Sequence, residues 1–210
     1  MAGYKSSADA MSAGDRLRQM SRANERLKDV LRLSYQVGLG AINASLLARR
    51  AGTASQGFRV AAAELGNFSC KMDEVMAVVE TAIFEAVNAA AGLQKMVRRQ
   101  QLLLLASKDS TRERELAWVD DSGRNLARNV QNIETGRVQL LVFLNRARVQ
   151  SSTGRVTARL ARLEAVHGGS LAPVMGEAVL VIEETVTQIV EILRELTRQF
   201  ENARVEKVRL

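Results

Sequence analysis

The side chains that most often carry chemistry in proteins are scarce in this sequence. Histidine occurs once, at His167, and cysteine once, at Cys70. A single histidine excludes a histidine-cluster metal site and argues against a histidine-based triad. A single cysteine excludes an intramolecular disulfide and a cysteine-rich zinc site. No nucleophile elbow, phosphate-binding loop or metal-ligand spacing is present either. We therefore expect a protein that is not an enzyme and that holds no cofactor and no metal.

Charged side chains, in contrast, are abundant and follow regular rows. The chain has 210 residues with 30 Lys and Arg against 23 Asp and Glu, a net charge of +7. One row is basic, with the members Arg148, Arg155, Arg159 and Arg162, and a second row is acidic, with the members Glu177, Glu184, Glu191 and Glu195. If the chain folds back near residue 169, we expect Glu177 near Arg159 or Arg162, Glu184 near Arg155, and Glu191 near Arg146 or Arg148. Exposed pairs of this kind contribute only about 0.2–1 kcal/mol each, but they fix helix register.

The elements that must position these rows are long helices. Apolar residues recur at alternating spacings of three and four, which is typical of helices that pack side by side. The clearest series run from Phe58 to Met96 and from Met175 to Ala203. Between them, a noisier series ends in a shifted register at Val149, Val156, Leu160 and Leu163. With breaks at glycine-containing and N-cap sequences, the pattern predicts four helices over about 12–51, 56–107, 110–166 and 173–207.

The short connections between these helices determine the predicted architecture. Short loops make sequential helices antiparallel neighbours. We therefore expect an all-α fold, a long antiparallel coiled-coil four-helix bundle in one domain over residues 1–210. It consists of two helical hairpins, over about 12–107 and 110–207, with their tips at the same end. On the second helix, Cys70 lies between Phe68 and Met72 and is expected to be buried.

No membrane-spanning or secretory segment is visible in the sequence. The longest apolar runs cover residues 102–106 and 178–182, whereas a spanning helix needs about 20 apolar residues. The first 14 residues contain no continuous apolar core of the kind a secretory signal has. We expect a cytoplasmic protein that does not insert into a membrane.

The tip of the first hairpin carries the most informative segment, residues 43–64, which reads NASLLARRAGTASQGFRVAAAE. It resembles the signalling tip of methyl-accepting chemotaxis receptors, whose pattern is N-A-A-x-E-A-A-R-A-G-E-x-G-x-G-F-x-V-V-A-x-E. The matching positions are Asn43, Ala44, Ala48, Arg50, Ala51, Gly52, Gly57, Phe58, Val60, Ala62 and Glu64. The resemblance extends more weakly over about 36–72, less than a fifth of the chain. Leu47 and Thr53 stand where the family has glutamates, and Ser55 stands where it has glycine.

The resemblance implies a function in signalling. In the family, this tip is an antiparallel coiled-coil hairpin that binds a histidine kinase and its coupling protein. The partner-binding residues implied here are Leu39, Asn43, Leu47, Arg50, Thr53, Phe58 and Val60, with the turn shaped by Gly52 and Gly57. The preferred interpretation is a soluble, non-catalytic, chemoreceptor-like signalling or scaffold protein with those partners. Because a receptor tip is a bundle of two identical hairpins, we expect a monomer that imitates the receptor dimer, or a homodimer.

Two other functions remain open. One is a structural helical bundle that binds a different protein partner through Leu47. The other is a basic bundle that binds nucleic acid through the arginine row, with affinity that falls steeply as salt rises. The glutamate row offers those arginines a structural partner instead, and aromatic residues, at 4% of the chain, are too few for base stacking.

Overall fold

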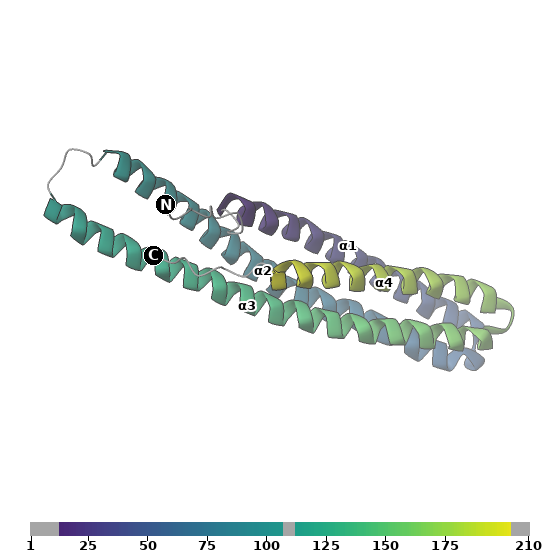
Figure 1. Cartoon of the computed structure of the whole chain (residues 1–210). Helices are drawn as coiled ribbons and strands as arrows, with labels where there is room; N and C mark the ends of the chain where they lie inside the picture. The colour runs from purple at the N-terminus through teal and green to yellow at the C-terminus, as the bar shows by residue number, and fades with distance from the viewer. Residues whose placement is uncertain (1–12, 107–111, 203–210) are drawn as a thin grey trace, which may run out of the picture.

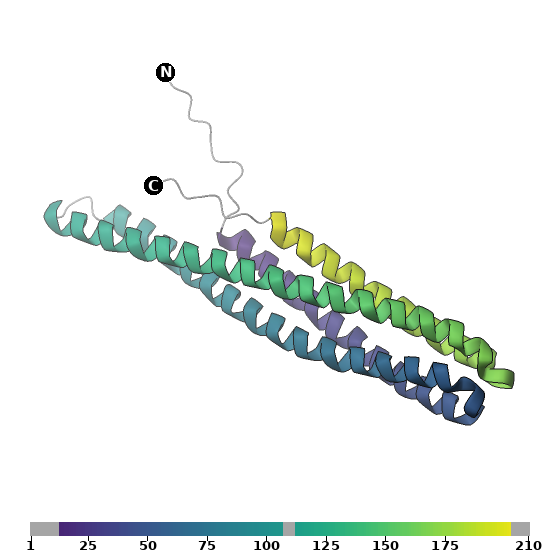
Figure 2. The ribbon, with the colours of Figure 1, turned by 90° about the horizontal axis from the view of Figure 1, so that it is seen from below.

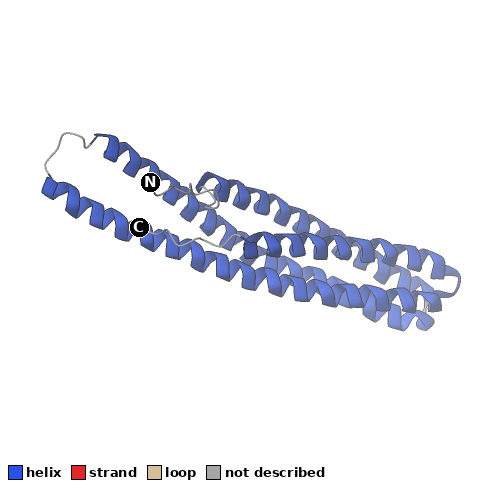
Figure 3. Cartoon of the chain, in the orientation of Figure 1, coloured by secondary structure: helices blue, strands red, loops and turns tan. Residues whose placement is uncertain are grey.

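The structure, a computed structural model, describes residues 13–106 and 112–202, which contain helices and no strand. The α-helices are α1 (Ala13–Ala51), α2 (Gln56–Ala106), α3 (Arg112–Ala165) and α4 (Ala172–Asn202), with the short 3₁₀ segments η1 (Thr53–Ser55) and η3 (Val166–Leu171) at two of the turns (Figures 1 and 3). These bounds agree with the predicted ranges to within about two residues. The turn near residue 109 and the predicted end of the last helix at 207 lie outside the described residues.

The helices pack antiparallel around a shared core. α1 contacts α2 and α4, and α3 contacts the same two helices from the other side. η1 and η3 contact one another, so the turns near residues 53 and 169 lie at the same end (Figures 1 and 2). α2 and α3 have 51 and 54 residues and α1 and α4 only 39 and 31, so α2 and α3 extend further at the opposite end. The prediction of an all-α fold of long antiparallel helices is confirmed.

The predicted core of α4 is confirmed throughout the described residues. The whole series from Met175 to Phe200 is buried, and the other face of the helix is exposed. α2 also buries most of its predicted series, and it adds Met76, Ile83 and Ala90. These additions arise because α2 contacts both α1 and α3. Two neighbouring helices bury a wider stripe of α2 than the single predicted series, which suits contact with one helix.

The predicted core of α3 is confirmed at Ile133 and Leu140, which are buried, but it is wrong from Val149 onward. Small residues are buried there, and they are Ala147, Ser151, Gly154, Ala158, Ala161 and Ala165. The larger residues Val149, Val156, Leu160 and Leu163 are exposed. The reason is the close approach of α2, because a Cβ atom at position 154 would lie 2.7 Å from two ring carbons of Phe68. Where helix backbones come this near, only small side chains fit between them.

The predicted ion pairs between α3 and α4 also need correction. Glu183, outside the predicted row, accepts a hydrogen bond from Arg159 Nε at 3.2 Å and lies 3.5 Å from Arg162 Nη1. Glu195 pairs with Arg26 of α1 at 3.5 Å. Glu177, Glu184 and Glu191 make no ion pair with the described residues, because burial of Ile182 and Val186 turns the predicted row outward, away from α3. The glutamates spaced by seven do share one face of α4, but that face points to the outside of the bundle and not towards the arginines of α3.

Cys70 is exposed, so the prediction that it is buried is wrong. Phe68 and Met72, two positions to either side, are both buried. Two residues along a helix correspond to a rotation of about 200°, which directs Cys70 to the side opposite its apolar neighbours.

Arg137 links α3 to the end of α4. Its Nη1 atom donates a hydrogen bond of 2.8 Å to the carbonyl oxygen of Phe200, and its Nε atom donates one of 3.0 Å to Glu134 Oε2. The hydrogen bonds to Glu134 raise the pKa of Arg137 above its usual value, although partial burial opposes this. This arginine, which interrupts the apolar series in the sequence, satisfies a carbonyl in the last turn of α4.

Two helical stretches are long and apolar enough to cross a membrane, judged by length and composition alone. They are Thr53–Met96 and Gln131–Asn202, and 33% and 28% of their most apolar windows is buried in the bundle. Core helices of this length and composition meet the same criterion, so the absence of membrane insertion stays a prediction.

Candidate partner-binding tip

The turn between α1 and α2 depends on Gly52. Its φ of 81° and ψ of −156° lie in a region that residues with a Cβ atom rarely adopt. No other atom lies near the position that a Cβ would occupy. The requirement for glycine at position 52 is therefore conformational.

Ser55 closes the same turn. Its buried hydroxyl lies 2.7 Å from the carbonyl oxygen of Ala48 and 3.0 Å from that of Gly52, and it donates to these acceptors. Ala48 is in the last turn of α1, where carbonyl groups have no partner within the helix. The serine that replaces the family's glycine therefore caps α1, a role that the sequence comparison did not indicate.

The cap provides a prediction for the stability of the tip. Replacing Ser55 with alanine is expected to lower the free energy of unfolding by about 1–2 kcal/mol, because it leaves a buried carbonyl without its donor. Urea denaturation followed by circular dichroism measures this change. Thr53→Ala, at an exposed position of the same turn, is the matched control and is expected to change stability by less than about 0.5 kcal/mol. Equal losses in the two variants would contradict the capping role.

Gly57 has a different role from the predicted one. It lies inside α2 rather than in the turn, and a Cβ atom there would collide with the carboxylate of Glu164 on α3. Gly57 therefore lies against the carboxylate of Glu164, where the two hairpins meet, and not in the reversal of the chain.

One exposed face of α1 unites three of the predicted partner-binding residues. Leu39, Asn43 and Arg50 are exposed at spacings of four and seven, which places them on the same side of the helix. Sequence reasoning missed the exposed apolar residues that extend this face, and they are Tyr35, Ile42 and Leu46. Their spacing of seven and four was a usable signal, because it forms a second apolar series offset from the buried one.

The remaining predicted residues are distributed differently. Phe58 is 0% exposed and packs in the core, so it offers no surface to a partner and its predicted contact role is replaced by a structural one. Leu47 is half-buried against the same core. Thr53 is exposed in the turn. Val60 is exposed three residues after Gly57, which places it on the side of α2 nearest α3 and apart from the α1 face.

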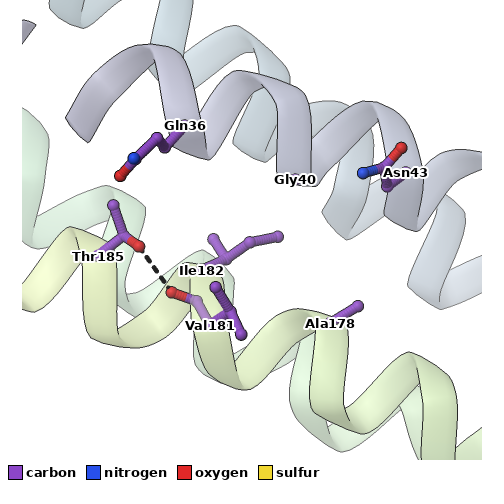
Figure 4. A pocket seen from close by; sticks show the side chains of 7 residues that line it. All are labelled: Gln36, Gly40, Asn43, Ala178, Val181, Ile182 and Thr185. Atoms are coloured by element: carbon purple, nitrogen blue, oxygen red, sulfur yellow. Dashed lines mark hydrogen bonds between the residues drawn. The ribbon is translucent and has the colours of Figure 1, made fainter. Parts of the chain in front are cut away.

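A shallow groove between α1 and α4 borders this face (Figure 4). Gln36, Gly40 and Asn43 line it from α1, and Ala178, Val181, Ile182 and Thr185 line it from α4. A Cβ atom at Gly40 would lie 2.7 Å from Ile182 Cγ1, so this glycine leaves room for Ile182 beneath the groove. Asn43 thus lies where both hairpins contribute to one surface.

The electrostatics of the tip are basic. Arg49 and Arg50 occupy the last turn of α1, where their positive charge is stabilised by the negative end of the helix dipole. Arg59 is exposed at the start of α2. Among the described residues, no group of three or more His, Cys, Asp and Glu side chains is placed to hold a metal ion. The arrangement suits recognition of a protein surface through apolar, amide and guanidinium groups.

Comparison with protein-family models, with curated proteins and with solved structures gives no significant match. The resemblance to chemoreceptor tips therefore remains a prediction that rests on the residues of the tip itself.

Proposed function

We propose that this chain is a non-catalytic, chemoreceptor-like signalling or scaffold protein. It binds a chemotaxis histidine kinase or its coupling protein through the tip formed by α1, η1 and α2. The observation that carries the proposal is the joint exposure of Asn43 and Arg50 on one face of α1, next to a turn that needs glycine at position 52. Asn43, Arg50 and Gly52 are among the positions at which the tip sequence matches the family pattern.

The surroundings of Asn43 and Arg50 support a docking role. Leu39, 45% exposed, lies one turn from Asn43 on the same face. An apolar patch next to an amide and a guanidinium group is the composition typical of protein-binding sites. The glutamates that the family has at positions 47 and 53 are absent, so the tip depends on the residues that remain.

We further propose that one chain supplies the helices that a receptor tip takes from two. α3 and α4 complete the bundle around α1 and α2, and their turn lies beside the receptor-like turn (Figure 2). The second hairpin carries no tip motif of its own. It stabilises the first hairpin and lines the groove beside Asn43.

A binding titration tests the proposed tip. The purified chain is titrated against the chemotaxis kinase and, separately, the coupling protein of its host, by calorimetry or interferometry. The double variant Asn43→Ala/Arg50→Glu is expected to weaken binding at least about tenfold, equivalent to about 1.4 kcal/mol, because it removes an amide and reverses a charge at the interface. Asn67→Ala/Arg98→Glu, which makes the same changes at exposed positions of α2, serves as the matched control.

Two results would contradict the proposal. One is the absence of binding to either protein by the folded wild-type chain. The other is equal weakening by the tip variant and its control. If one chain imitates the receptor dimer, we expect any assembly of this protein to dissociate on dilution into single chains that remain folded. An assembly in which chains exchange hairpins would contradict that part.

A further inference from the structure

The outer face of α3 carries a long apolar stripe. Its residues are exposed and lie on the side opposite the buried alanines, and they are Val138, Val142, Val149, Val156, Leu160 and Leu163. Four of them are separated by seven residues, and the stripe runs for about 38 Å along the helix. Leu163 is 71% exposed, more than several surface leucines elsewhere in the chain. An exposed stripe of this length and spacing indicates a contact with another helix.

Neighbouring faces of α3 and α4 carry opposite charges, with arginines on α3 and glutamates on α4. Arg148 and Arg155 precede Arg162 at intervals of seven, and Arg162 contacts Glu183, so all three lie on the side of α3 nearest α4. Glu184 and Glu191 are exposed on the outer face of α4 and make no ion pair with the described residues. Neighbouring helices thus present a basic row and an acidic row to the same outer surface.

The two rows are in register along the bundle. The contacts from Arg159 to Glu183 and from Arg137 to the carbonyl of Phe200 fix how α3 and α4 align. Interpolation between these contacts places Arg155 level with Glu184, and Arg148 level with Glu191, to within about one helical turn. Within one chain the glutamates point outward and miss these arginines.

We propose that the surface formed by α3 and α4, the α3/α4 surface, binds the same surface of a second copy of this chain. A two-fold axis parallel to the bundle places α3 of one copy against α4 of the other and keeps every residue at its own level. Arg148 then meets the partner copy's glutamate row near the level of residue 191, and Arg155 meets it near residue 184. The apolar stripe is covered by α4 of the second copy, where Leu180 is exposed.

The charges favour this arrangement over a direct contact of α3 with α3 of the second copy. A contact of α3 with α3 would also cover the stripe, but it would bring two arginine rows together and cost association energy. The two-fold arrangement through both helices pairs each basic row with an acidic one. It also places both tips at the same end of the dimer, because the axis is parallel to the bundle. Two tips presented together bind a multivalent partner more tightly than one.

Sedimentation velocity across a range of protein concentrations tests this interface at low salt. We expect a dimer that dissociates into folded chains on dilution. The charge reversals Arg148→Glu/Arg155→Glu and Glu184→Arg/Glu191→Arg are each expected to raise the dimer Kd at least about tenfold. Combining all four substitutions in one chain is expected to return the Kd to within about threefold of wild type, since the rows are then exchanged. Circular dichroism verifies that every variant is folded.

Several results would overturn the proposal. One such result is a wild-type chain that stays monomeric at every concentration. Another is a dimer whose Kd neither charge reversal raises. A third is failure of the combined variant to recover the wild-type Kd. A dimer broken by Leu39→Ser/Ile42→Ser instead would assign the interface to α1. Binding of single chains to phosphatidylserine vesicles, lost in Arg148→Glu/Arg155→Glu, would assign the surface to a membrane. The charge reversals on α3 and α4 leave the exposed face of α1 unchanged, so their effect on the dimer is independent of the proposed tip function.

Discussion

Replacing Gly154 with leucine is expected to lower the free energy of unfolding by about 3 kcal/mol, near the upper end of the usual cost of overpacking a core. Gly154 lies under the ring of Phe68, and even a single Cβ atom would lie 2.7 Å from the ring carbons. The ring is buried between helices, and protein interiors are packed closely enough that displacing it or the α3 backbone disturbs neighbouring contacts. Urea denaturation followed by circular dichroism measures the loss.

Gly136→Leu is the matched control for Gly154→Leu. Gly136 lies in the same helix, and, apart from its chain neighbours and the local helix backbone, no described atom lies within 4 Å of the position that its Cβ would occupy. Leucine is the better helix former, so this variant is expected to be unchanged or more stable by up to about 1 kcal/mol. If Gly154→Leu proved as stable as its control, α3 would not approach α2 as closely as the structure indicates.

The helices themselves were predictable because their signals are local. Helix ends follow from turn residues such as Gly52 and Pro173, and α4 begins at Ala172, next to the proline. The buried face of α4 follows from a predicted series that holds only large apolar residues from Met175 to Phe200, with Thr185 and Thr197 buried beside it. In such a segment, size and burial agree, so periodicity alone selects the right face.

α3 could not be predicted in the same way, because size and burial disagree there. Its buried positions include Gly154 and Ala158, whereas Val149, Val156, Leu160 and Leu163 point outward. A search for large apolar residues selects the outer face of α3 and assigns it to the core, so the buried and exposed faces are exchanged. The correct choice depends on the position of Phe68 on α2, which is a tertiary contact that no local pattern contains.

The candidate site was predictable only in part. The resemblance selected Asn43 and Arg50, and both lie on an exposed face of α1. The role of Ser55 depends on a hydrogen bond to Ala48 across the turn, which spacing does not indicate. The assignment of Phe58 to a partner contact failed because a sequence resemblance does not distinguish a surface residue from a core residue.

Replacing Phe58 with alanine is expected to lower the free energy of unfolding by about 3–5 kcal/mol. Phe58 is completely buried at the start of α2, near the end of the bundle where η1 and η3 meet. Loss of the ring leaves a cavity that the surrounding helices fill only partly, so both the transfer energy and the contacts of the ring are lost. Denaturation by urea or heat, followed by circular dichroism, measures this change.

The matched control, Val60→Ala, separates the structural role of Phe58 from a binding role. Val60 is 58% exposed, so its truncation is expected to change stability by less than about 0.5 kcal/mol. At a temperature where Phe58→Ala is still folded, its Kd for the kinase or coupling protein is expected to stay within about twofold of wild type. A large rise in Kd with unchanged stability would instead mean that Phe58 leaves the core to contact the partner. The burial of this ring argues against that movement, because exposing it in water costs the same transfer energy that its truncation forfeits.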